Sequence, residues 1–110
     1  MDHARAELFR VAWGDIRGWR EDNLANLPAA QRAIDAGAAP ADVALAMSAA
    51  AYEAVFTLMF ALDEGADPNG QPGRQLWALV DPSDGRRIAG LHEEVLMADP
   101  SGREGGDLFA

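Results

Sequence analysis

The chain contains no cysteine and no lysine. Without cysteine it can form no disulfide and no zinc–thiolate site, and it has no thiol nucleophile. Its basic residues are therefore all arginine, the residue that makes forked hydrogen bonds to carboxylates and phosphates. Because alanine, arginine and glycine share GC-rich codons, we attribute the missing lysines to a GC-rich source genome rather than to chemistry.

Motifs for phosphate binding, hydrolysis and metal binding are also missing. No GxxxxGK[ST] or GxGxxG sequence opens a helix, and no serine lies in a GxSxG elbow. The acidic residues of the turn at 81–85 do not follow the spacing of an EF-hand calcium loop. We therefore expect no enzyme activity, no cofactor and no metal ion. No basic segment followed by an apolar one begins the chain, which predicts a cytoplasmic protein without a secretory signal.

Positive charge is scarce as well. The chain has 18 acidic and nine basic residues, which gives a net charge of −9 and a pI near 4.4. This balance disfavours binding to nucleic-acid phosphates and to anionic membranes. We expect a protein partner with a basic surface instead, since complementary charge speeds association. The length of 110 residues suits a single compact domain with its own core.

The first helix is predicted over residues 3–20, where apolar side chains gather on one side of a helical wheel. Gly14 and Gly18 weaken this helix, each by about 1 kcal/mol relative to alanine. They predict either a bend or early end of the helix, or a smooth patch that another helix backbone approaches closely. Both interpretations remain open at this point.

Two further helices are bounded by proline and glycine. Pro28 and Gly37 delimit a short helix over 28–36, and a third runs over 40–64 before Gly65. The third helix has a side of small residues and is apolar nearly all round, which predicts a central, buried helix. It carries Glu53 within its apolar run, which argues against a membrane span.

The last third of the chain predicts a β-hairpin over 75–89, because apolar residues alternate on either side of a proline- and glycine-containing turn at 81–85. A short helix over 91–98 and a tail over 99–110 follow. The expected fold is therefore α+β: a small helical bundle around the long helix, with a C-terminal hairpin and short helix. An all-α fold with a long irregular loop is the alternative.

Glu53 and His92 are the residues whose side chains are the strongest candidates for catalysis or ligand binding. A buried carboxylate such as Glu53 is costly unless it is paired, so it could act as a general base or bind a ligand. We favour the simpler interpretation, in which the alanine side of its helix reaches the surface or an arginine pairs with it. His92 lies at the junction of the hairpin and the short helix, where a functional residue is well placed, but histidines there commonly have no function.

Trp77 is the leading candidate for a partner contact, because tryptophan is enriched among residues that dominate binding energy. The competing interpretation, which we rate slightly higher, makes it an ordinary core residue. The candidate partner-binding residues are Trp77, Arg86, Arg87, His92, Glu93 and Glu94.

Several stretches resemble a recurring pattern in small acidic bacterial proteins of uncharacterised type. They are Ala51–Phe56, Leu76–Asp81, the Asp84-Gly85 turn, Arg87–Glu93 and Asp99–Glu104, and the span from 51 to 104 that contains them is about half of the chain. In size, acidity and lack of a catalytic motif the chain is also similar to immunity proteins of polymorphic-toxin systems. This resemblance implies a non-catalytic module that neutralises a cognate toxin. Two alternatives stand beside it: a small homo-oligomeric regulatory or structural module, such as a homodimer, and a small ligand-binding protein or enzyme using Glu53 and His92.

Overall fold

The structure is a computed structural model that describes residues 2–66 and 75–110. Four α-helices lie in these residues: α1 (His3–Ile16), α2 (Pro28–Asp35), α3 (Pro40–Glu64) and α4 (Leu91–Glu94). Two 3₁₀ helices accompany them, η1 (Glu21–Asn26) and η2 (Gly106–Phe109). Within the described residues the protein is therefore helical and contains no β-strand.

Local signals explain where these helices begin and end. Asp2 accepts a hydrogen bond from the Arg5 amide and caps α1, and Pro28 and Pro40 each occupy the first position of a helix. α3 ends at Gly65, whose φ of 76° is the left-handed conformation that glycine adopts freely. The first helix ends at Ile16 and does not reach residue 20. The chain turns here so closely that a Cβ at position 18 would lie 2.6 Å from the Gly14 carbonyl oxygen, and Gly18 permits this turn because it has no Cβ.

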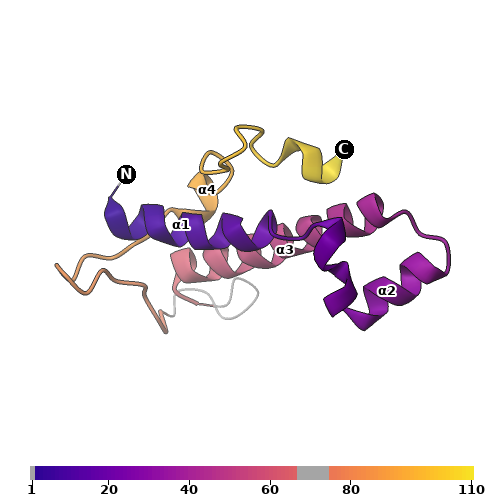
Figure 1. The fold of residues 1–110 in the computed structure, drawn as a ribbon. Coiled ribbons are helices and arrows are strands. Elements are labelled where there is room, and N and C mark those ends of the chain that lie inside the picture. Colours follow the sequence, from indigo (N-terminus) through magenta and orange to yellow (C-terminus); the bar gives the residue numbers. More distant parts are fainter. Residues whose placement is uncertain (1, 67–74) are drawn as a thin grey trace.

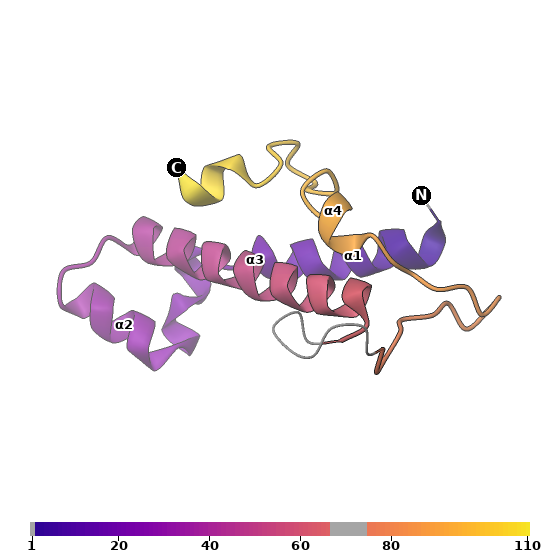
Figure 2. The ribbon, with the colours of Figure 1, turned by 180° about the vertical axis from the view of Figure 1, so that it is seen from behind.

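α1 and α3 lie side by side, and the rest of the chain is arranged around this pair (Figure 1). α2 extends beyond the amino end of α3, while α4 and the C-terminal segment run along one side of both long helices (Figure 2). The molecule is elongated, with extents of 49 × 31 × 25 Å. Its radius of gyration of 16.5 Å exceeds the roughly 13 Å of a compact domain of this length.

The main core lies where α1, α3, α4 and η2 meet. Its largest fully buried side chains, Phe9, Trp13 and Ile16, come from α1, and Leu91 and Val95 approach them from the C-terminal segment. The Trp13 indole donates a hydrogen bond to the Val95 carbonyl oxygen at 2.8 Å. A second, smaller cluster joins η1, α2 and the start of α3 through Leu24, Ala30 and Ala44.

The expected β-hairpin over 75–89 does not form, and the α+β fold class is wrong. The turn itself is present, since the Gly85 amide donates to the Asp81 carbonyl oxygen, but within residues 75–89 the only ladder contact is an isolated bridge between Val80 and Arg87. The amides of Leu76 and Trp77 instead donate to the Gly65 carbonyl at the end of α3. With no third strand beside it, a two-stranded hairpin is marginal in water, and the all-α alternative describes the fold.

α3 is the helix against which the other elements pack, but it is not enclosed by them. In its most apolar stretch of 18 residues only 22% is buried, so the expectation of a buried helix is wrong for most of its surface. α3 is long and apolar enough to cross a membrane, but core helices of soluble proteins meet the same criterion of length and composition. The cytoplasmic location remains a prediction.

Candidate functional site

The outer face of α3 is an apolar surface whose side chains are exposed among the described residues. Residues three and four apart lie on one face of a helix, and this face carries Ala46, Ala50, Ala54 and Leu58, all exposed. Leu58 has 62% of its surface accessible to solvent. The opposite face, with Ala44, Ser48, Tyr52 and Met59, is buried. Figure 2 shows α3 in front of α1, so the side of α3 that is turned away from α1 faces the viewer.

Trp77 lies at the carboxyl end of this face. Its indole Nε1 donates a hydrogen bond to the Ala61 carbonyl oxygen at 3.0 Å, and its amide is tied to Gly65. The side chain is nevertheless 40% exposed, and Leu76 beside it in sequence is 55% exposed. Trp77 is therefore not a core residue, and the interpretation that we rated higher is wrong. A tryptophan whose indole nitrogen is hydrogen-bonded while much of its apolar ring is exposed to solvent fits the contact interpretation.

A pocket of about 480 Å³ lies at the other end of the face, between α2 and α3. It is bordered by Leu27, Ala30, Val43, Ala46 and Met47, with Asp42 as its one charged residue. Since Ala46 belongs to both features, the pocket continues into the outer face of α3. We call the pocket residues, the exposed Ala50, Ala54 and Leu58, and Trp77 together the α3 surface.

The other candidate residues do not form one site. Arg87 donates from its guanidinium to the Asp63 carbonyl oxygen, and His92 contacts the Asp63 carboxylate, whereas Trp77 bonds to the Ala61 carbonyl oxygen. Glu94 pairs with Arg5 at 3.2 Å. Arg86 lies by Asp84, and Glu93 is exposed. Trp77, Arg87 and His92 therefore each bond to the carboxyl-terminal turn of α3, through different atoms, while Glu94 and Arg86 pair with residues outside α3.

Glu53 is exposed on α3 and has no ion-pair partner among the described residues. This placement agrees with the favoured interpretation, in which the alanine side of the helix reaches the surface. The carboxylate partner of His92 is Asp63, not Glu53. The structure thus does not unite Glu53 and His92 in one catalytic pair.

The Asp63 side chain accepts hydrogen bonds from the Leu91 and His92 amides, at 3.0 and 2.9 Å, and so caps the start of α4. Burial opposes ionisation of this carboxyl group, but the bonds from His92 and Leu91 outweigh it and hold its pKa below the usual value. The His92 ring packs edge-on against Phe56 and Phe60. No described hydroxyl group bonds to the ring, so Asp63 and His92 join α3 to α4 without the nucleophile that a catalytic triad requires.

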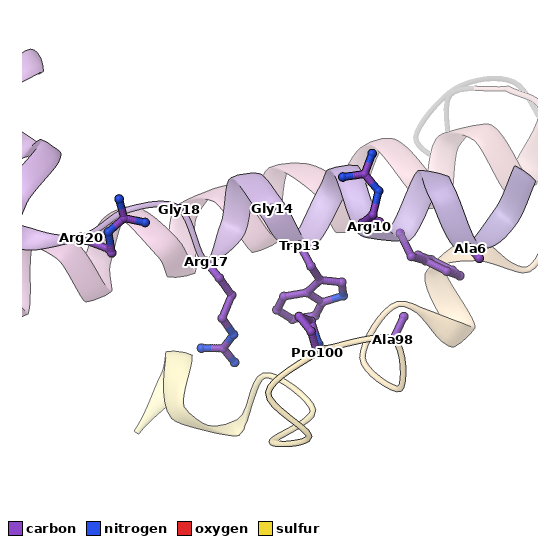
Figure 3. Close-up of a pocket in the computed structure, with 10 residues that line it drawn as sticks. Ala6, Arg10, Trp13, Gly14, Arg17, Gly18, Arg20, Ala98 and Pro100 are labelled. Carbon is purple, nitrogen blue, oxygen red and sulfur yellow. The ribbon is translucent and has the colours of Figure 1, made fainter.

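A groove of about 590 Å³ runs along α1 (Figure 3). Phe9, Trp13 and Pro100 form much of its apolar wall, and three arginines line it: Arg10, Arg17 and Arg20. Each arginine is already paired within the chain. Arg10 pairs with Glu7 and Arg20 with Asp22, while Arg17 points toward the C-terminal segment (Figure 3). The groove therefore presents little uncompensated positive charge to an anion.

Arg17 fastens the C-terminal segment to α1. It donates two hydrogen bonds to Asp99, at 3.1 and 2.7 Å, and two to Asp107, at 2.8 and 2.9 Å. Burial raises the pKa of Asp99, but Arg17, the Gly105 amide and Ser101 outweigh this effect and hold it far below the usual value. The hydrogen bonds from Arg17 lower the pKa of Asp107 to about 2. We assign this cluster a structural role, because the charge of Arg17 is paired with carboxylates of the same chain.

Asp63, Asp99 and Arg17 were missed by sequence reasoning. A carboxylate in the last turn of a helix opposes the helix dipole, so the position of Asp63 signals a partner from elsewhere in the chain. The Asp99-Pro-Ser sequence is typical of a turn in which the aspartate binds nearby amides, and this is what Asp99 does with Ser101. The long-range pairing with Arg17 has no local signal.

No group of three or more histidine, aspartate or glutamate side chains in the described ranges could hold a metal ion. No protein-family model matches the chain, and neither the curated proteins nor the solved structures contain a match.

Proposed function

We propose that the chain is a non-catalytic protein-binding module and that the α3 surface is where its partner docks. The observation that carries the proposal is that Leu58 is exposed on the strongly apolar helix α3 and that Trp77 is exposed beside the carboxyl end of this helix. Contiguous apolar surface of this kind is uncommon on monomeric proteins and marks interaction sites. A tryptophan anchored by its indole nitrogen suits such a site, because tryptophan is enriched among binding hot spots.

The partner we propose is a protein with a basic surface. The chain has a net charge of −9, and Asp42 and Glu53 lie exposed beside the apolar residues of α3. Complementary charge would steer such a partner toward this face. Neutralisation of a cognate bacterial toxin is the specific activity that fits these features and the resemblance to immunity proteins.

The test expresses the product of the gene directly upstream in bacterial cells, with and without this chain. We expect growth to stop with the upstream product alone and to recover on coexpression. The double variant Leu58→Glu/Trp77→Ala should lose this protection. Met97→Glu is the matched control, since Met97 is 70% exposed on the C-terminal segment, and it should protect like the natural chain.

Absence of any growth effect from the upstream product would remove the toxin interpretation. Protection that survives the double variant would remove the α3 surface as the docking site. Self-association is tested separately by light scattering of the purified chain. The proposal expects a monomer of 11.7 kDa, and a particle of twice this mass would favour the homo-oligomeric module.

A further inference from the structure

Three acidic residues form a row along α3. Asp42, Glu53 and Glu64 are spaced by 11 residues, and all three are exposed. Eleven residues make three helical turns with a drift of about 20°, so the carboxylates lie on one side of the helix, about 16 Å apart. None of them forms an ion pair with another described residue.

The row borders the apolar residues of the α3 surface. Ala46, Ala50 and Ala61 follow the acids around the helix, and Ala54 and Leu58 lie beyond them. An apolar stripe with one acidic edge thus extends from the pocket at Met47 to Trp77. The three acids span 22 residues, or about 33 Å of helix.

We infer that the α3 surface binds one amphipathic helix of a partner protein, about six turns long, that carries arginine or lysine at 11-residue intervals beside an apolar stripe. This inference rests on the proposed function and names the element that docks. Helix-in-groove recognition uses apolar anchors at helical spacing. The pocket at Met47 takes a large apolar anchor at one end of the partner helix, and Trp77 packs on an anchor at the other.

The charge pattern argues against a second copy of this chain as the occupant. Antiparallel pairing about a two-fold axis would bring the two acidic rows to the same edge of the interface. Because the row is symmetric about Glu53, such pairing would set Glu53 against its copy and Asp42 against Glu64 of the other chain. Like charges in contact oppose association, whereas a helix with matching cations would neutralise the row.

The test measures binding of two fluorescently labelled helical peptides to the whole chain by anisotropy. Both peptides have about 23 residues, enough to span the row, and the same leucine and alanine stripe. One has arginine at three positions spaced by 11 residues, and the other has glutamate there. We expect saturable one-to-one binding of the arginine peptide and at least tenfold weaker binding of the glutamate peptide.

Variants of the chain locate the binding. Asp42→Asn/Glu53→Gln/Glu64→Gln should weaken binding of the arginine peptide about tenfold, since exposed ion pairs each contribute a modest and salt-screened amount. The control Asp15→Asn/Glu21→Gln/Glu104→Gln changes the net charge equally at exposed sites off α3 and should bind within about twofold of the natural chain, because distant exposed charges are screened. Leu58→Glu should also weaken binding.

Equal loss in the two triple variants, or no saturable binding of the arginine peptide, would overturn the inference. Binding to phosphatidylcholine vesicles in place of the peptide would assign the face to a bilayer and overturn it too. If protection in cells survives neutralisation of the row but is lost in Leu58→Glu/Trp77→Ala, the proposed function stands and the charged-helix partner is wrong.

Discussion

The two long helices of this protein lie side by side and are used in opposite ways. α1 contains Gly14 and several charged residues, yet its large apolar side chains Phe9, Trp13 and Ile16 are almost completely buried. α3 is far more apolar, yet most of its apolar stretch is uncovered. Burial in this fold therefore follows position in the assembly of helices and not the apolar content of a helix.

The comparison separates apolar residues that stabilise the fold by being buried from apolar residues that stay exposed. The buried side of α3 meets α1, α4 and η2, and this contact forms the core. Among the described residues, Trp77 bonds to the carboxyl end of α3 and the pocket beside α2 borders its amino end. Apolar side chains that contribute little to folding are available for a partner, which is the basis of the proposed function.

The largest expected effect contrasts two tryptophans. Trp13 is 1% exposed and bonded to Val95, so Trp13→Ala should lower the free energy of unfolding by about 3–5 kcal/mol, the usual cost of truncating a large core side chain. Trp77→Ala should cost about 1 kcal/mol, the net value of one hydrogen bond and a partial contact. Urea unfolding followed by circular dichroism checks both, and equal losses would erase the distinction between the two regions.

The fastening of the C-terminal segment comes next. Arg17→Ala leaves the buried Asp99 carboxylate without its cation, which should cost about 3 kcal/mol of unfolding free energy. The exposed Arg10, whose pair with Glu7 lies on the surface, supplies the control, and Arg10→Ala should change stability by less than about 0.5 kcal/mol. A loss at Arg17 no larger than at Arg10 would show that the segment is held by its apolar contacts alone.

The same cluster predicts an acid-sensitive stability. Asp99 and Asp107 have pKa values below those of the unfolded chain, so their contribution is complete above about pH 4, the unfolded value, and declines as the pH falls. For Asp107 the decline runs toward its folded pKa of about 2; for Asp99 it continues lower. Urea midpoints should therefore fall more steeply with acid in the natural chain than in Arg17→Ala. Parallel curves for the two proteins would contradict this assignment.

Gly14 offers a smaller effect of opposite sign. It lies inside α1, and a Cβ at this position would meet nothing within 4 Å. Gly14→Ala should therefore raise the unfolding free energy by about 1 kcal/mol through helix propensity. Thermal unfolding measures the gain. A destabilised Gly14→Ala variant would show that the groove along α1 is narrower in solution than in this structure.

Much of the helical framework could be predicted because its signals are local. Pro28 and Pro40 begin helices and Gly65 ends one whatever the rest of the chain does. The prediction of a β-hairpin was wrong because the stability of a strand depends on partners that are distant in sequence. The amides of Leu76 and Trp77 donate to the Gly65 carbonyl oxygen, and no local sequence pattern predicts this alternative partner.

The candidate site shows the same division. The residue types of the α3 surface could be predicted, but their exposure could not. A helix that is apolar all round suggests burial, and only the arrangement of α1, α4 and the C-terminal segment shows that they cover one side. Trp77 is exposed, as a contact residue must be, but its contact role stays a prediction, and the alternation used to place it belongs to a strand that does not form.

The most direct test of the account is the stability of Leu58→Glu, which puts a charge at the centre of the α3 surface. Because Leu58 is 62% exposed, the account predicts that the unfolding free energy of the purified chain, measured in urea, changes by no more than about 0.5 kcal/mol. A loss above about 2 kcal/mol, the size expected for a charge forced into a core, would show that the outer face of α3 is buried within the folded chain and would contradict the claim that it is free for a partner.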